Sequence, residues 1–437
     1  MAPLTQIWKA FVQPARQEYN VWDLGPRLMN LEVDRSIQVF REDMELKNNR
    51  GHVLKCSHWR RVSQPGISYD DRELCVIYLH GMGSSRCDAW SILESTLVRG
   101  VSLFAFDFAG CGQSDGDYVS LGCHEESDVE LVINYLLNSG RATTVALWGR
   151  SMGAATAIFR AAKDPSIAAC VLDSPFSDFV DVAWEVANCT RVPVPRALVW
   201  LLLRSMRSEV LQEAGFDLMQ VRPLKAAPKA KMPVWFCTGS EDDFILPHHT
   251  ADLHEAWGSG SVAQTERRIS YLPGTHSGMR PRWFHEAASD FLKANLQKLQ
   301  AERRALAHPP HPRHAAVPLP ATPRRRCDSP DASAGAPARV DAAELEQRSM
   351  RFSSAAPAVE ETLRRTLRAA TQAHLEGVES SRASGIRGGP CSTISGARSL
   401  HAQLLSLGIS EAHAATALAR CSSIEAAVEW LAKEGLM

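Results

Sequence analysis

The residues at 147–153 read L-W-G-R-S-M-G, in which a serine stands in the pattern G-x-S-x-G. A β-branched, apolar run precedes them at 143–147 and an Ala-rich helical segment follows at 154–162. A serine at such a strand-to-helix turn is held in a strained backbone conformation with its hydroxyl clear of the sheet, and small neighbours let strand and helix pack closely. The pattern predicts that Ser151 is a nucleophile.

A nucleophilic serine needs a base that takes its proton. His276 lies on the Gly-flanked loop P-G-T-H-S-G at 273–278, directly after an expected strand at 268–272. The base of this type of site follows the serine and the acid in the sequence, so His276 is the predicted base. The pair at 248–249 is also histidine, but it stands at a helix start, too early in that order.

The acid that orients the base is expected between Ser151 and His276. Asp242 is favoured, because it lies three residues past Gly239 at the tip of an expected strand. Asp243 is the alternative, because its spacing to Pro247 is the common one. Asp173, which ends the preceding expected strand, is a third candidate.

A serine attack on an acyl carbonyl also needs two N–H donors for the developing oxyanion. The buried-strand run L-C-V-I-Y-L at 74–79 ends in the loop H-G-M-G at 80–83. In α/β-hydrolases a loop of this type provides one backbone N–H, and the residue after the nucleophile provides the other. We assign these donors to Met82 and Met152. No metal or organic cofactor is needed for this chemistry.

The elements around these residues predict an α/β fold. Two strands at 37–46 and 52–62 are expected as a hairpin, joined by N-N-R-G. From residue 74 onward strands and helices alternate, which favours a mostly parallel sheet with helices on both faces. The segment at about 178–230 breaks this pattern and is expected to be a helical lid, which either lines an acyl pocket or packs on the scaffold. The first residues, with Trp8 and Phe11 among them, are expected to be irregular.

The composition bounds the class of protein. Of 437 residues, 45% are hydrophobic and 22% charged, and the net charge is −1, which fits a globular protein and gives no indication of nucleic-acid binding. The 11 scattered cysteines favour a reducing compartment, and we expect a cytoplasmic location. Residues 1–16 lack the apolar core of a secretory signal. No stretch reaches the roughly 20 apolar residues of a transmembrane helix.

Composition also divides the chain. We expect a catalytic domain at 1–299, followed by a disordered linker at 300–398 that is rich in Pro, Ala and Arg and contains a possible solvated helix. Helical patterning returns at 399–437, where three short helices, one of them at 411–419, would form a small bundle. Bundles of this size usually serve as binding modules.

Two resemblances support this division. Residues from about 5 to 298 resemble α/β-hydrolases of the serine-aminopeptidase-like group of plants and protists. The matching motifs lie at residues 16–20, 49–52, 106–114, 148–153, 172–178, 242–249 and 274–281. The resemblance implies a serine hydrolase that cleaves an ester, thioester or amide acyl bond of a small molecule or an acylated protein.

Residues from about 399 to 437 resemble a ubiquitin-associated (UBA) domain. Leu407, Gly408 and Ile409 match its first loop, and the run A-V-E-W-L at 427–431 matches its third helix. The resemblance implies that ubiquitin is a partner and that Leu407, Gly408 and Ile409 contact it. An alternative function is therefore a ubiquitin-binding adaptor whose hydrolase domain is a catalytically minor scaffold.

Overall fold

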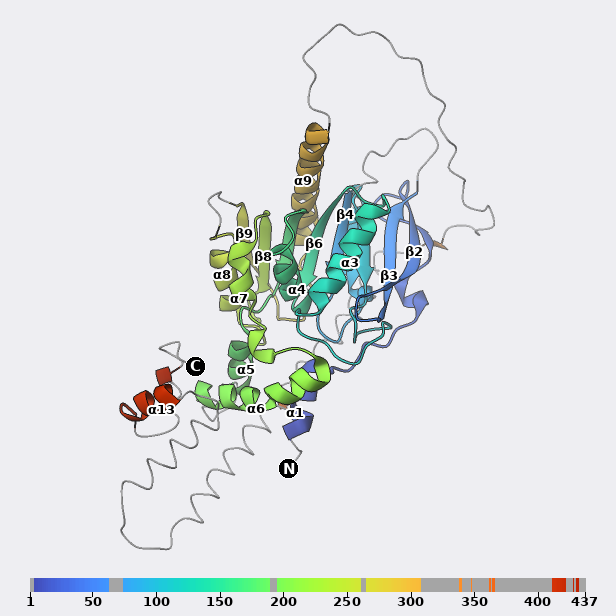
Figure 1. Cartoon of the computed structure of the whole chain (residues 1–437). Coiled ribbons are helices and arrows are strands. Elements are labelled where there is room, and N and C mark those ends of the chain that lie inside the picture. The colour runs from blue at the N-terminus through green and yellow to red at the C-terminus, as the bar shows by residue number, and fades with distance from the viewer. Residues whose placement is uncertain are drawn as a thin grey trace, which may run out of the picture.

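The computed structural model describes residues 4–62, 74–188, 195–260, 265–307 and 411–421, with short pieces at 338–339, 347, 361–362, 364–365, 427 and 430–431. Its strands form a ten-stranded sheet in the order β10-β1-β2-β3-β5-β4-β6-β7-β8-β9 (Figure 1). Their bounds are β1 (Leu28–Asn30), β2 (Gln38–Lys47), β3 (Val53–Arg61), β4 (Leu74–Leu79), β5 (Ser102–Phe106), β6 (Thr144–Arg150), β7 (Ile167–Asp173), β8 (Val234–Gly239), β9 (Arg267–Leu272) and β10 (Ala338–Arg339).

The expected hairpin is present. Strands β2 and β3 pair in antiparallel register, and the turn between them ends at Gly51, whose φ of 89° suits glycine. Asn48 closes the turn, because its Oδ1 accepts hydrogen bonds from the backbone N–H groups of Arg50 and His52. Strand β1, which sequence analysis did not predict, pairs with β2 in antiparallel register.

Strands β4 to β9 run parallel, as the alternation of strands and helices predicted. Strand β5 lies on one side of β4 and β6 lies on the other. The direction in which the chain crosses the sheet therefore reverses at β4. Binding sites of open parallel sheets form outside the carboxyl ends of the strands at such a reversal. The loops after β4 and β6 meet there.

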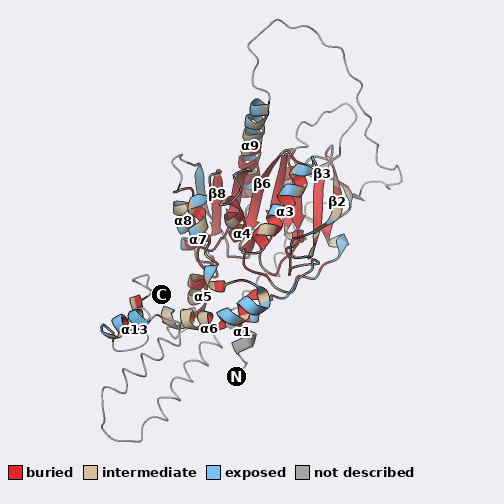
Figure 2. Cartoon of the chain, in the orientation of Figure 1, coloured by how far each residue is buried: buried red, intermediate tan, exposed pale blue. Residues whose placement is uncertain are grey.

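Helices cover both faces of the sheet. On one face lie α2 (Trp90–Leu97), preceded by η3 (Arg86–Ala89), and α9 (Arg282–Ala307), and on the other lie α3 (Glu125–Asn138), α4 (Met152–Ala161) and α8 (Pro247–Ala256). Successive residues of β4 pack alternately into the hydrophobic cores on the two faces of the sheet. Val76 lies in the core on the first face, and Ile77 lies in the core on the second. Figure 2 shows the central strands buried throughout. This double burial explains the uninterrupted apolar run at 74–79.

The predicted helical lid is present between β7 and β8. It consists of α5 (Phe179–Asn188), α6 (Arg196–Ala214), η4 (Leu218–Gln220), α7 (Pro223–Ala226) and η5 (Ala227–Lys229). Helices α5 and α6 lie together beyond one end of the sheet (Figure 1). Among the helices that the structure describes, none combines the length and the apolar composition needed to cross a bilayer.

The expectation of an irregular N-terminus is wrong, because residues 4–12 form a helix. In α1 (Leu4–Val12), Trp8, Phe11 and Val12 share one face at spacings of three and four residues and are buried against the lid helices. The indole Nε1 of Trp8 donates a hydrogen bond of 2.9 Å to Glu209 of α6. The short helix η1 (Val21–Leu24) follows.

Helix α9 continues past the predicted domain boundary at 299. Neither Gly nor Pro interrupts the sequence before Pro309, and the helix runs to Ala307. Arg303 donates hydrogen bonds of 2.6 and 3.0 Å to the carbonyl oxygens of Thr143 and Ser166, so this turn packs on the catalytic domain. Most of the predicted linker lies outside the described residues, and its division at 300–398 stays a prediction. Strand β10 pairs in parallel with β1.

The C-terminal helix α13 (Glu411–Leu418) buries Ala414 and Ala417 in a small cluster. Ala197 and Trp200 of the lid helix α6 pack against this cluster. Leu407, Gly408 and Ile409 lie outside the described residues.

Eight cysteines of the described part of the chain are free thiols. Cys75, Cys170 and Cys237 lie in β4, β7 and β8 and are fully buried, where cysteine acts as a small apolar residue. Burial raises the pKa of each of these three thiols.

Candidate active site

Ser151 occupies the sharp turn between β6 and α4. Its backbone has φ 51° and ψ −115°, a strained conformation for a residue with a side chain. Its N–H donates a hydrogen bond of 2.8 Å to the carbonyl oxygen of Asp173. A Cβ at Gly149 would lie 2.4 Å from the carbonyl oxygen of Gly153, and one at Gly153 would lie 2.1 Å from that of Leu79. The two glycines therefore allow the close packing of strand and helix at this turn.

The structure brings Ser151, His276 and Asp242 together, although they lie on three separate loops. Nε2 of His276 is 3.0 Å from Oγ of Ser151. Nδ1 of His276 is 2.8 Å from Oδ2 of Asp242. A carboxylate only accepts hydrogen bonds, so the imidazole proton belongs on Nδ1 and the lone pair of Nε2 faces the serine hydroxyl.

Asp242 is buried and held in place by the backbone. Its Oδ1 accepts hydrogen bonds of 2.8 Å from the N–H of Ile245 and 3.2 Å from the N–H of Phe244. Burial by itself raises the pKa of Asp242, but the charge of His276 and the hydrogen bonds from His276, Ile245 and Ser174 outweigh this effect and lower it. The side chain is therefore an ionised carboxylate that faces the imidazole.

The two other acid candidates point elsewhere. The side chain of Asp243 is 72% exposed and forms an ion pair of 2.9 Å with Arg364. Asp173 is buried beside the site, where its carboxylate forms an ion pair of 2.8 Å with Arg280. Neither carboxylate contacts His276, so geometry separates them from Asp242.

Two arginines that sequence analysis did not select hold the histidine loop. Arg280 donates hydrogen bonds of 2.9 and 3.0 Å from Nε to Asp173 and one of 2.9 Å from Nη1 to the carbonyl oxygen of Thr275. Arg150 donates from Nη2 to the carbonyl oxygens of His276 and Gly278, at 3.0 and 2.9 Å. The sequence feature that could have indicated these arginines is Asp173, which ends a fully buried strand, since a buried carboxylate requires a cationic partner.

Because of the ion pair of Asp173, the stability of this loop depends on pH. Burial by itself raises the pKa of Asp173, but the charges of Arg280 and Arg150 lower it below its ordinary value. Its ionised form is then favoured in the folded state. The resulting stabilisation is present above an unfolded-state pKa of about 3.9 and is lost as the pH falls through the lower folded-state value.

The loop after β4 is fixed by His80, which is fully buried. Its Nδ1 is 2.7 Å from the carbonyl oxygen of Gly81, and its Nε2 accepts a hydrogen bond of 3.1 Å from the N–H of Phe108. Both contacts are satisfied by the neutral ring with the proton on Nδ1. Met82 of this loop and Met152, the first residue of α4, both line the same cavity as Ser151.

This cavity encloses about 460 Å³ of empty space, part of it open to solvent. Apart from Ser151, its lining is apolar, and it comes from α1, α5 and the loops at the ends of the strands: Phe11, Met82, Leu121, Met152, Phe176, Phe179, Val182, Ala183, Val186, Phe244 and Ile245. Sequence analysis left open whether the lid lines a pocket or only packs on the scaffold. Helix α5 does line the pocket.

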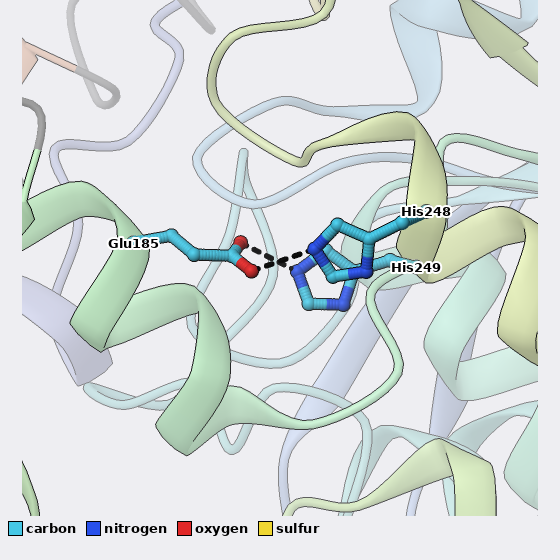
Figure 3. Close-up of side chains that lie close together, drawn as sticks. All are labelled: Glu185, His248 and His249. Atoms are coloured by element: carbon cyan, nitrogen blue, oxygen red, sulfur yellow. Dashed lines mark hydrogen bonds and ion pairs between the residues drawn. The ribbon is translucent and has the colours of Figure 1, made fainter. Parts of the chain in front are cut away.

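The histidine pair that the sequence order excluded as the base contacts the lid. His248 and His249, at the start of α8, both face Glu185 of the lid helix α5 (Figure 3). Within the described residues, these three side chains are the group that could hold a metal ion.

Comparisons with known proteins agree with this architecture. Residues 70–220 match the family model described as serine aminopeptidase, S33. The uncharacterized protein YqkD of Bacillus subtilis (strain 168) is 25% identical over 232 residues, which are 52% of this chain and 74% of that protein.

Two similar solved structures are esterases. For the Pyrococcus furiosus esterase Pf2001, the identity is 21% and the TM-score 0.46, over 66% of this chain and 99% of that chain. For acetyl xylan esterase 1 from Thermoanaerobacterium sp. JW/SL YS485, the values are 19% and 0.45, over 61% and 87%.

The strand order, the serine turn and the family match together define an α/β-hydrolase fold. The chain is a serine hydrolase.

We predict that the Arg280 ion pair stabilises the site. Arg280→Met leaves the buried Asp173 carboxylate without its cation, so the free energy of unfolding in urea should fall by about 3–5 kcal/mol. Arg282→Met is the matched control, because Arg282 is 63% exposed and pairs with Glu286 on the surface. Its effect should stay within about 0.5 kcal/mol. Equal losses in the two variants would contradict the role of the pair.

Proposed function

We propose that the enzyme cleaves an ester or thioester acyl bond with Ser151 as nucleophile, His276 as base and Asp242 as the acid that orients it. The supporting observation is the continuous hydrogen-bond chain from Asp242 through His276 to Ser151. In this mechanism Nε2 of His276 takes the serine proton as Oγ attacks the carbonyl carbon, and it later gives the proton to the leaving group. A water molecule then releases the acyl group by the same steps.

The backbone N–H groups of Met82 and Met152 are proposed to stabilise the oxyanion. The N–H of Met152 belongs to the first turn of α4, where it has no acceptor within the helix and lies at the positive end of the helix dipole. Both residues adjoin the cavity that contains Ser151. Donors fixed in this way stabilise the charge that develops in the transition state.

We propose an apolar acyl group as the part of the substrate that enters the pocket. No charged side chain is among the residues of the described chain that line the cavity, so an ammonium or carboxylate group would lose its hydration there without a partner. A hydrocarbon chain or an aromatic ring would replace water against Phe11, Phe179 and Val186. The same lining disfavours cleavage next to a free amino terminus, and we place peptidase activity second to esterase or thioesterase activity.

Covalent labelling tests the nucleophile. Ser151→Ala removes the only oxygen that His276 activates in the proposed mechanism, so reaction with a fluorophosphonate probe should be abolished while the circular dichroism spectrum stays unchanged. Ser139→Ala, at the exposed end of α3, is the control and should label like the wild type. Undiminished labelling of the Ser151→Ala variant would exclude Ser151 as the nucleophile.

A pair of amide substitutions tests the acid. Asp242→Asn presents the wrong partner to Nδ1 of His276 and should lower kcat for a p-nitrophenyl ester by up to about 10⁴-fold. Asp243→Asn alters an exposed side chain that does not contact His276 and should change kcat less than about threefold. The opposite ranking would assign the acid to Asp243.

We also propose that the C-terminal module binds ubiquitin through Leu407, Gly408 and Ile409. The resemblance of 399–437 to UBA domains supports this proposal, as does the small helical core around Ala414 and Ala417. A tethered module of this kind would raise the local concentration of ubiquitin-linked partners near the hydrolase.

Titration of isotope-labelled ubiquitin with the full chain tests this binding. Chemical-shift changes should centre on the hydrophobic face of ubiquitin and disappear with a chain that ends at residue 398. The absence of shifts at millimolar concentration would contradict the proposal. Ubiquitin binding without measurable turnover of any acyl ester would instead favour the adaptor function.

The thiols support a reducing, cytoplasmic location for the enzyme. Free cysteines of the described chain, fully buried in β4, β7 and β8, fit a compartment in which disulfides are not formed.

A further inference from the structure

A second cluster of reactive side chains lies between the lid and the catalytic domain, apart from Ser151. Glu185 projects from α5, and His248 and His249 project from the first turn of α8 (Figure 3). Nε2 of His248 is 2.7 Å from Oε1 of Glu185, and Nε2 of His249 is 2.8 Å from its Oε2. The ligand atoms of the three residues all lie within 4.8 Å of one another.

The far nitrogen of each imidazole also faces an oxygen atom. Nδ1 of His249 is 2.7 Å from Oγ of Ser177 and accepts a hydrogen bond of 3.4 Å from the N–H of Ser177, and Nδ1 of His248 is 3.5 Å from Oδ2 of Asp252. Histidines that bind a metal through Nε2 almost always donate the remaining N–H to such an acceptor, which fixes the tautomer and the direction of the ring. An ion pair or a hydrogen bond to Glu185 alone does not require these outer partners.

The burial of the three side chains is graded. The side chain of His249 is fully buried, that of Glu185 is 10% exposed and that of His248 is 49% exposed. The cluster is thus held by the interior on one side and reached by solvent on the other.

We propose that Glu185, His248 and His249 form a binding site for a divalent transition-metal ion of borderline softness, with Zn²⁺ as the reference ion. Two imidazole nitrogens and one carboxylate oxygen provide three ligands, and the exposed side of His248 leaves a fourth position to water. Bond lengths of about 2.0–2.2 Å separate neighbouring ligand atoms in a tetrahedral site by roughly 3.3 Å. The Glu185 carboxylate must therefore withdraw by about half an ångström from its present contacts.

The protons balance without a co-reactant. In the metal-free protein the two Nε2–H groups donate to Glu185. When the ion binds, each Nε2 gives its lone pair to the metal, and the proton of each ring moves from Nε2 to Nδ1. That proton is then donated to Ser177 by His249 and to Asp252 by His248.

A bound ion would fasten the lid. Glu185 belongs to the same helix as Ala183 and Val186, which line the cavity beside Ser151. His248 and His249 follow closely after Ile245, whose N–H donates a hydrogen bond to Asp242. The ion would join α5 to α8 and hold the apolar wall of the pocket in position. This role does not depend on which acyl group the enzyme cleaves.

Equilibrium metal binding to the full chain tests the site. Chelator-stripped protein is titrated with Zn²⁺ in competition with a chromophoric chelator. Wild type should bind one equivalent that His248→Gln and Glu185→Gln both lack. His254→Gln, on the same helix but outside the cluster, is the control and should bind like the wild type. His248 is half exposed, and glutamine keeps the size of glutamate at position 185, so these variants leave the buried His249 in place.

Two further measurements make the result specific. Asp252→Asn should weaken Zn²⁺ binding by about 10- to 100-fold, as expected for loss of an outer partner. Co²⁺ should give the visible absorption of a four-coordinate ion in wild type and in His254→Gln only. If His248→Gln and Glu185→Gln retain the stoichiometry and affinity of wild type, the proposal is overturned. Stabilisation of the lid by Glu185 without any difference in metal binding would overturn it equally and leave a hydrogen-bonded contact.

Discussion

The buried ion pair between Asp173 and Arg280 determines where the histidine loop can lie. Asp173 ends β7, accepts the N–H of Ser151 through its carbonyl oxygen and binds Arg280 through its carboxylate. Arg280 in turn donates to Thr275, directly before His276. One residue at the end of a strand thus fixes both the serine turn and the loop of its partner. A buried charge pair of this kind tolerates little displacement, because a charge without its partner is costly in a water-excluded interior.

The sheet and the lid contribute different parts of the site. The parallel strands bring the loops of Ser151, Asp242 and His276 to one edge, as carboxyl ends of neighbouring strands must. The lid helix α5 and the N-terminal helix α1 then cover this edge with apolar side chains and enclose the cavity. The polar framework is buried, whereas much of the apolar wall of the cavity belongs to the lid helix α5. Changes in the lid therefore alter the shape of the pocket without disturbing the hydrogen bonds of the framework.

Most of the fold followed from periodicity. The run at 74–79 predicted β4 because a strand buried on both faces shows no polar alternation, and the turn N-N-R-G predicted the β2–β3 hairpin. Helix α1 was missed because its apolar face becomes evident only against the lid, which is far away in sequence. Helix α9 runs past the predicted domain boundary at 299, where Arg303 donates to carbonyl acceptors that no local pattern indicates.

The residue types of the candidate site and their order along the chain could be predicted from the sequence. The direction in which each side chain points could not. The sequence placed Asp242 and Asp243 side by side, and spacing alone left both open. One side chain turns inward and is held by the N–H groups of Phe244 and Ile245, while the other turns to solvent. Arg150 and Arg280 were not selected, because arginines are usually exposed and their partners come from loops that only the fold brings together.

The buried thiols offer a way to measure local opening of the sheet. Cys75, Cys170 and Cys237 have no exposed surface, and burial raises the pKa of each thiol, so neither access nor ionisation permits alkylation in the closed state. A reagent can modify them only in molecules whose strands have locally separated. The modification rate of each cysteine then measures how often β4, β7 or β8 opens, in the same way that hydrogen exchange measures the opening of backbone amides.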